Sequence, residues 1–317
     1  MKTKMISLLL ALVMVLSLTA CGGAGNGTTA PPDSGQSAQP VDALSDTHIF
    51  IDDCGREVEI PSEITRLVPS GPLAQIVLFA LAPEMFVGLA TKWHESAEGI
   101  IADEYLELPY FGQLYGSADL NMEELAFAAP QIIVDIGEAK GSIVADLDTL
   151  QTQTNIPSVF VSATLETMPE TYRKLGELLG KQEEAERIAQ FCERVYDRTL
   201  SIMEEVGDNK VDALYILGAE GLNVLANGSY HAELIDMLTN NLAVVDDASS
   251  RGTGNAVGME QLSVWDPDYI IFAPVSIYSD VAEKETWREM TAIANGNYIE
   301  VPEGPHNWMG SPPAVQR

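Results

Sequence analysis

Polar and aromatic residues cluster in loops that follow predicted strands, at the edge where parallel sheets bind ligands. In the first half of the chain these are Ser70, Gly71, Trp93, His94, Tyr110 and Glu138; in the second half they are Tyr230, His231, Arg251, Asn307 and Trp308. Aromatic rings, amides and a guanidinium can hold a bulky solute by stacking and hydrogen bonding. The set therefore predicts a ligand-binding cleft.

Several of these residues also have an ordinary structural explanation. Trp93 and Tyr110 could be half-buried aromatic residues, and His94 and Arg251 could be surface residues. Ser70 could be the N-cap of the helix that follows it.

Motifs of common catalytic sites do not occur in the sequence. We find no G-x-S-x-G elbow, no P-loop and no H-E-x-x-H. The four histidines, His48, His94, His231 and His306, do not have metal-ligand spacing, and no C-x-x-C occurs. We therefore expect a binding protein with no catalytic residues, no resident cofactor and no metal site; an envelope hydrolase is the least favoured alternative.

Two other ligand classes stay open. Residues from two lobes need no linear spacing, so Tyr230, His94, His231 or His306 could bind a bare metal ion or haem directly. A small oxyanion such as molybdate could be held by Arg251 and loop amides.

A repeated motif indicates how the candidate cleft is built. Met122-Glu123-Glu124-Leu125 and Met259-Glu260-Gln261-Leu262 are each followed by four residues, a proline and an apolar run. Each copy predicts a short helix stopped by proline and then a buried parallel strand. We expect Leu125, Phe127 and Ala128 on the apolar face of the first helix, and Leu262 and Trp265 on that of the second. The two copies predict equivalent elements in two α/β lobes.

The glutamates of the repeat, Glu123 and Glu260, lie near the helix starts. There the helix dipole favours a negative charge, which would be a purely structural role. Their equivalent places in two lobes favour a shared function.

Other patterns complete the expected fold. A hairpin is predicted over 48–60, a buried strand over 64–68, a helix over 73–81 and a strand over 85–89. A long helix over 181–206 joins the lobes, and strands are predicted over 211–217, 222–225, 242–245 and 298–301. Cys54 and Cys192 could form a disulfide in an exported protein.

The N-terminus resembles an export signal. Lys2 and Lys4 precede an apolar stretch, and Leu18-Thr19-Ala20-Cys21 resembles a bacterial lipobox, which implies lipid attachment at Cys21. Residues 22–45 are rich in small and polar residues, which is typical of a flexible tether.

Composition limits the partners. The net charge of −30 argues against nucleic acid, and a hydrophobic fraction of 46% excludes global disorder. The expected organisation is a signal peptide (1–20), lipidated cysteine and tether (21–45), N-terminal lobe (46–168), interdomain helical backbone (169–206) and C-terminal lobe (207–317).

Three segments resemble one known family. They are Asp53-Cys54-Gly55-Arg56 with Val58 and Pro61, residues 121–130, and residues 258–267. They are similar to the substrate-binding lipoproteins of ABC importers for ferric siderophores, haem and cobalamin, which are periplasmic binding proteins with a helical backbone.

The resemblance implies two α/β lobes, each with a mostly parallel sheet, bridged by one long helix with the solute between them. It implies a monomer, lipid-anchored on the outer face of the cytoplasmic membrane or periplasmic, whose Glu123 and Glu260 dock onto arginines of an ABC permease dimer. The family continues with helical sequence after a segment like 308–317, so we expect the second lobe to be truncated.

Overall fold

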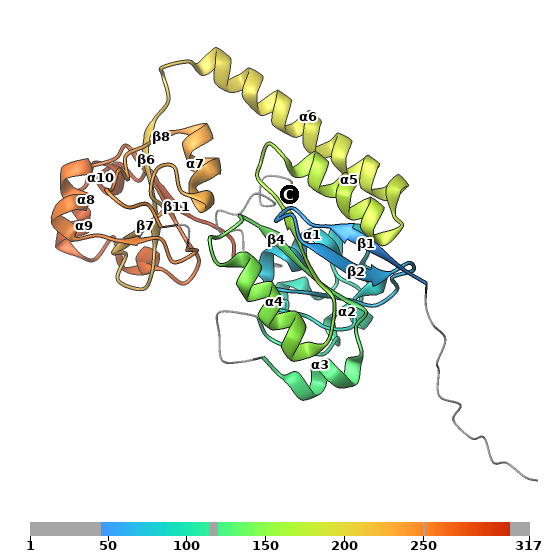
Figure 1. Ribbon diagram of the computed structural model, residues 1–317. Helices are drawn as coiled ribbons and strands as arrows, with labels where there is room; N and C mark the ends of the chain where they lie inside the picture. Colours follow the sequence, from blue (N-terminus) through green and yellow to red (C-terminus); the bar gives the residue numbers. More distant parts are fainter. Residues whose placement is uncertain (1–45, 114–119, 250, 305–317) are drawn as a thin grey trace, which may run out of the picture. The chain divides into compact units, whose positions relative to one another are not determined.

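The computed structural model describes residues 46–113, 120–249 and 251–304. Cys21, His306, Asn307 and Trp308 lie outside these ranges. The described chain starts with the predicted hairpin, in which β1 (Thr47–Ile51) pairs antiparallel with β2 (Glu57–Pro61) (Figure 1). No helix in these ranges is long and apolar enough to cross a membrane.

Arg56 fixes the hairpin to the rest of the first lobe. The buried Asp52 carboxylate accepts hydrogen bonds from the backbone N–H groups of Cys54 (3.0 Å) and Arg56 (2.9 Å). The Arg56 guanidinium bonds to Asp52 at 3.1 Å, to Asp148 at 2.9 Å and to the Ser158 carbonyl at 2.7 Å. This part of the family-like pattern therefore has a structural role.

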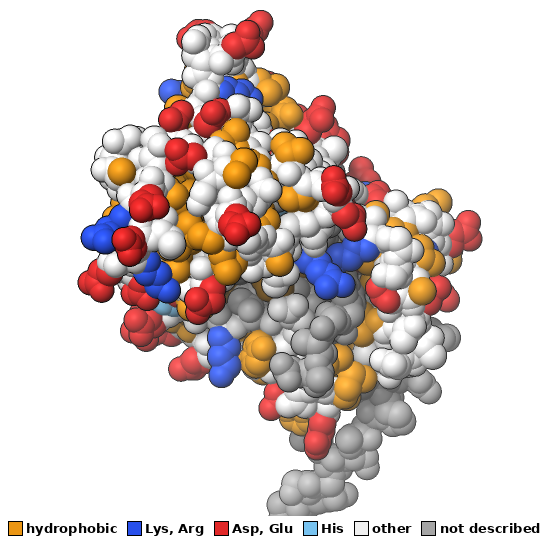
Figure 2. All heavy atoms as spheres, turned by 90° about the vertical axis from the view of Figure 1, so that its left-hand side faces the viewer, with side chains coloured by type: hydrophobic (Ala, Val, Ile, Leu, Met, Phe, Trp, Pro, Cys, Tyr) orange, Lys and Arg blue, Asp and Glu red, His pale blue; other side chains and the backbone are white. Residues whose placement is uncertain are grey.

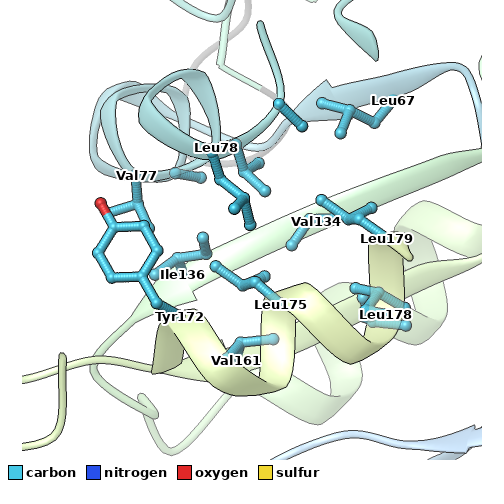
Figure 3. Close-up of a cluster of buried hydrophobic side chains, with 14 of the residues drawn as sticks. Leu67, Val77, Leu78, Val134, Ile136, Val161, Tyr172, Leu175, Leu178 and Leu179 are labelled. Atoms are coloured by element: carbon cyan, nitrogen blue, oxygen red, sulfur yellow. The ribbon is translucent and has the colours of Figure 1, made fainter. Parts of the chain in front are cut away.

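The first lobe contains a parallel sheet in the order β3 (Leu67–Pro69), β4 (Ile132–Gly137) and β5 (Ser158–Ser162). Val134 and Ile136 of β4 lie in one apolar cluster with side chains from α1 (Pro72–Leu81) and α5 (Met168–Leu179), as Figure 3 shows. Ile133 lies in a second cluster with Leu125 and with Leu150 of α4 (Ile143–Thr154). Alternate side chains of β4 thus enter different clusters, as expected for a strand buried on both faces.

The predicted strand over 85–89 does not form. Met85 ends a 3-10 turn, η1 (Pro83–Met85), and Phe86 and Leu89 make only isolated bridges to Leu67 and Tyr110. Met85, Phe86 and Leu89 are nevertheless buried. The apolar run therefore reflects packing in the core and not strand pairing. Two short helical segments, η2 (Glu95–Ala97) and α2 (Asp103–Leu106), follow.

The long helix is confirmed as α6 (Gln182–Val206). Gly180, with a φ of 68°, ends α5 in the left-handed conformation before α6 begins. Ala185, Ala189 and Cys192 of α6 pack in the first-lobe core. The disulfide considered from the sequence does not form: Cys54 packs in a different cluster from Cys192, and both thiols are free.

In the second lobe, β6 (Asp212–Leu217), β10 (Tyr269–Phe272) and β11 (Tyr298–Glu300) are parallel neighbours. β7 (Asn223–Val224) pairs antiparallel with β6 and with β9 (Asn255–Ala256). The helical segments are η3 (Tyr230–Ala232), α7 (Glu233–Leu238), α8 (Met259–Trp265), η4 (Ile277–Asp280), α9 (Glu285–Arg288) and α10 (Thr291–Ala294).

The predicted strand over 242–245 is replaced by a shorter one. β8 (Asn240–Asn241) pairs with Asp212 and Ala213 at the start of β6. β7 pairs with β6 at Ile216 and Leu217, so β8 has only the first part of β6 available. The architecture of two α/β lobes joined by α6 is otherwise as predicted.

Candidate functional site

Ser70 and Glu138 follow β3 and β4 at the carboxyl edge of the first-lobe sheet. Ser70 is buried; its hydroxyl donates to the Asp135 carboxylate, and its N–H donates to the Val134 carbonyl at 3.0 Å. Ser70 is therefore not the N-cap of the following helix, which was one interpretation of this residue from the sequence. Gly71 takes the N-cap position of α1 without a side-chain bond, and a Cβ there would meet nothing within 4 Å.

Two hydrogen bonds join this edge to the second lobe. The Tyr230 hydroxyl donates to the Ala163 carbonyl at 2.7 Å, just after β5. The Glu233 carboxylate accepts from the Leu165 N–H at 3.0 Å. We call Ser70, Asp135, Glu138, Tyr230 and Glu233 the junction group.

The junction group is acidic and partly shielded from water. Burial raises the pKa of Glu233, although the hydrogen bond from Leu165 opposes the shift; the charges of Glu138, Asp236 and Glu166 raise it further. Burial also raises the pKa of the Tyr230 hydroxyl, followed in effect by Glu233, Glu138 and Asp135. Such a site favours a neutral or cationic group over an anion.

His231 extends the junction group toward solvent. Its ring lies edge-on to the Tyr230 ring, with centroids 5.3 Å apart, and its side chain is partly buried. The partly exposed imidazole of His231 therefore adjoins the carboxylates, whereas the Tyr230 ring is buried.

Three of the predicted residues, Trp93, His94 and Tyr110, line one hollow of about 620 Å³, which we call the aromatic hollow. This volume lies in the range of ligand pockets. Trp93 packs edge-on against Phe79 with centroids 4.8 Å apart, and the Lys92 Nζ lies 5.6 Å from the Tyr110 ring centroid. Its other lining residues are Leu89, Lys92, Glu95, Glu98, Leu106, Leu108, Pro109 and Glu124.

The second lobe contacts one of the residues that line the hollow. Gly304, beyond β11, packs against the His94–Ser96 turn, in which the His94 Nδ1 lies 2.9 Å from the Ser96 hydroxyl. A Cβ at Gly304 would lie 2.5 Å from that Nδ1, closer than atoms can pack. His94 therefore lies at a second contact between the lobes.

Arg251 is not brought into either of these groups. Arg251 is exposed before β9, where its N–H donates to the Ser249 hydroxyl at 3.2 Å. Asn307 and Trp308 lie outside the described ranges. Within those ranges, no three His, Cys, Asp or Glu side chains gather in a way that could hold a metal ion.

Sequence reasoning missed Asp135 and Glu233. Asp135 interrupts the apolar run of β4, and a charge within a buried strand was a signal that could have identified it. Glu233 starts α7, where an acidic residue is ordinary, so its pattern gave no such signal.

The two motif copies have matching geometry. α3 (Met122–Ala128) and α8 are both seven residues long, with Glu123 and Glu260 exposed in the first turn. Leu125 and Leu262 are buried. Each helix ends at a left-handed residue, Ala129 (φ 44°) or Asp266 (φ 38°). The expectation of equivalent elements in two lobes is confirmed in this respect.

The prediction that Phe127 belongs to the apolar face of α3 was wrong, because its side chain is 93% exposed. Successive helical residues turn by about 100°, so Phe127 lies roughly 200° around the helix from Leu125. Only one of them can face the core.

The model of the periplasmic binding protein family matches residues 110–305, more than half of the chain. No curated protein matches the chain.

Solved structures with a similar fold include an ABC transporter solute binding protein from Sulfurospirillum deleyianum, with 22% identity and a TM-score of 0.73 over 84% of this chain and 85% of that one. The molybdate periplasmic binding protein MolA from Haemophilus influenzae has 16% identity and a TM-score of 0.67, over 85% and 88%. The periplasmic heme-binding protein RhuT from Roseiflexus has 15% identity and a TM-score of 0.60, over 80% and 94%. The chain belongs to the periplasmic binding protein family.

Proposed function

We propose that the protein is the extracytoplasmic solute-binding component of an ABC importer and captures an iron chelate, haem or cobalamin between its lobes. Family membership supports the role of binding and delivery, which involves no catalysis. The solute class rests on the junction group and on the aromatic hollow, which has the size of a ligand pocket and is lined in part by Trp93 and Tyr110.

The negative charge of the junction group narrows the class of solute that we propose. Glu138 and Glu233 lie close enough for each charge to act on Tyr230, and burial weakens the screening of these charges. On this basis neutral or cationic complexes, such as cobalamin or a ferric hydroxamate, should bind better than molybdate or an anionic ferric catecholate.

The location follows from the N-terminal pattern together with the family. We propose that residues 1–20 are cleaved and that lipid on Cys21 anchors the protein outside the cytoplasmic membrane through the tether. Labelling with a radioactive fatty acid tests this, because Cys21→Ser should abolish incorporation. Incorporation by the variant would disprove the anchor at this residue.

Delivery is proposed to use Glu123 and Glu260, which are exposed on matching helices. Changing both to lysine should abolish uptake and leave solute affinity intact. Loss of affinity would mean that the glutamates act in solute binding and not in docking.

The solute class is tested by tryptophan fluorescence of the form that lacks residues 1–21. The panel is cobalamin, haemin, a ferric hydroxamate and a ferric catecholate, with free metal ions and molybdate as contrasts. We expect saturable quenching by a neutral or cationic chelate, reduced in Trp93→Phe because that ring lines the hollow. A response to molybdate or a bare ion alone would overturn the proposed class.

A further inference from the structure

Each of the repeated helices exposes a large apolar side chain to solvent. Phe127 in α3 is 93% exposed and Val264 in α8 is 78% exposed. They occupy the same position in the two motif copies, five residues after Met122 and Met259. Burying such a side chain stabilises a contact, so this exposure points to a partner surface.

Each apolar residue lies beside a docking glutamate. Glu123 and Phe127, like Glu260 and Val264, are four residues apart on a helix, so their side chains are neighbours on one face. The opposite face is anchored by Leu125 or Leu262, which are almost fully buried. Both lobes therefore present the same pair, one carboxylate and one apolar side chain, to solvent.

The helices that carry these pairs are held in place at their C-terminal ends. In the first lobe, the Arg66 guanidinium donates to the Ala128 carbonyl and, at 3.1 Å, to the Ala129 carbonyl. In the second, the Asp266 carboxylate accepts from the Thr291 N–H and hydroxyl, both at 2.7 Å. Little conformational entropy would be lost when a partner binds such fixed positions.

We propose that Phe127 and Val264 are apolar anchor residues of the permease-docking surface, an inference that rests on the proposed function. Each inserts into an apolar depression of the permease beside a basic side chain that pairs with Glu123 or Glu260. Because the pair occurs twice, the matching permease surface is two-fold, as a dimer provides.

The negative charge of Glu123 and Glu260 argues against other partners for this surface. A second copy of this chain would place Glu123 or Glu260 against like charges, and an anionic lipid surface would repel them too. On the face drawn in Figure 2, acidic side chains are widespread and basic ones form a few separate spots, so self-association there is also disfavoured.

The test measures affinity between the full-length protein and the permease with which it supports solute uptake, reconstituted in nanodiscs. Phe127→Ser and Val264→Ser should each weaken the complex at least tenfold, and the double variant more. Val244→Ser is the matched control, because Val244 is 71% exposed but lies outside both helices. It should leave the affinity unchanged.

Solute affinity and the melting temperature should be unaltered in all these serine variants, since the three changed side chains face solvent. If the serine variants bind the permease like the wild type while Glu123→Lys with Glu260→Lys does not, the anchors are refuted and the proposed docking function stands. If the charge reversals also leave binding unchanged, the docking surface itself is wrong. A dimer lost on Phe127→Ser would identify a second copy as the occupant and overturn the proposal.

Discussion

Replacing Tyr230 by phenylalanine removes one oxygen from the contact between the lobes. The hydroxyl donates to the Ala163 carbonyl at 2.7 Å, and the tyrosine side chain is buried. The ring remains, so the change isolates this hydrogen bond. Its loss leaves the carbonyl without this donor in a buried place, at a cost of about 1–3 kcal/mol.

This cost falls on the joined state of the lobes and not on either lobe alone. A destabilisation of 1–3 kcal/mol shifts the equilibrium between joined and separated lobes by roughly 5- to 150-fold. The Leu165 amide reports this equilibrium directly, because its N–H donates to Glu233 of the second lobe. We expect its hydrogen exchange to accelerate by the same factor in Tyr230→Phe.

Hydrogen exchange measured residue by residue provides the assay and its control. The Ile133 N–H donates to the Pro157 carbonyl at 2.9 Å within the first lobe, so its exchange should not change. Unchanged exchange at Leu165 would refute the idea that Tyr230 holds the lobes together. Equal acceleration at Leu165 and Ile133 would show instead that the first lobe itself is destabilised.

Three further predictions concern stability. Glu233→Gln should stabilise the protein relative to the wild type, and increasingly so as the pH rises above about 4, where a carboxyl of ordinary pKa ionises in the unfolded chain. The reason is that the raised pKa of Glu233 in the folded state makes ionisation of this carboxyl destabilise the fold. Urea unfolding at several pH values measures the difference in stability, and a difference that does not change with pH would contradict the prediction. Arg56→Ala should cost about 3 kcal/mol by leaving a buried carboxylate without its cation, and an unchanged unfolding midpoint would contradict this. Ala129→Gly should stabilise the protein by about 1 kcal/mol, because the φ of Ala129 is positive. Asp266→Gly at the equivalent place should destabilise it, because the variant loses both hydrogen bonds to Thr291. Melting temperatures that move in the same direction in the two variants would contradict this pair of predictions.

Local patterns in the sequence identified the elements that strong periodicity specifies. The hairpin, α1, α6 and both copies of the repeated helix and strand lie where the sequence places them. The apolar runs over 85–89 and 242–245 were misassigned as strands. The first packs in the core instead, since an apolar run satisfies a core contact as readily as a strand pairing. In the second, Ala243 is buried and Val244 is exposed. Whether such a run packs in the core or pairs as a strand depends on neighbours that are distant in the sequence.

The sequence named single residues of the candidate site, whose role in binding stays a prediction, but it did not name their partners. Trp93, His94 and Tyr110 were predicted to line a cleft and do share one hollow. The bond from Tyr230 to Ala163 joins residues 67 positions apart, and no local pattern predicts such a pair. Phe127 was misassigned because a helix of seven residues has too few turns for its buried face to be deduced from spacing alone.

The most direct test of solute capture between the lobes is carboxyl footprinting with and without the tightest-binding solute of the panel. Carbodiimide labelling should fall at Glu138 in the first lobe and at Glu233 in the second, and stay unchanged at Glu123 of α3 and Glu260 of α8. Protection of Glu138 and Glu233 together would place the solute between the lobes. Protection confined to one lobe, or found at Glu123 and Glu260 instead, would contradict this account.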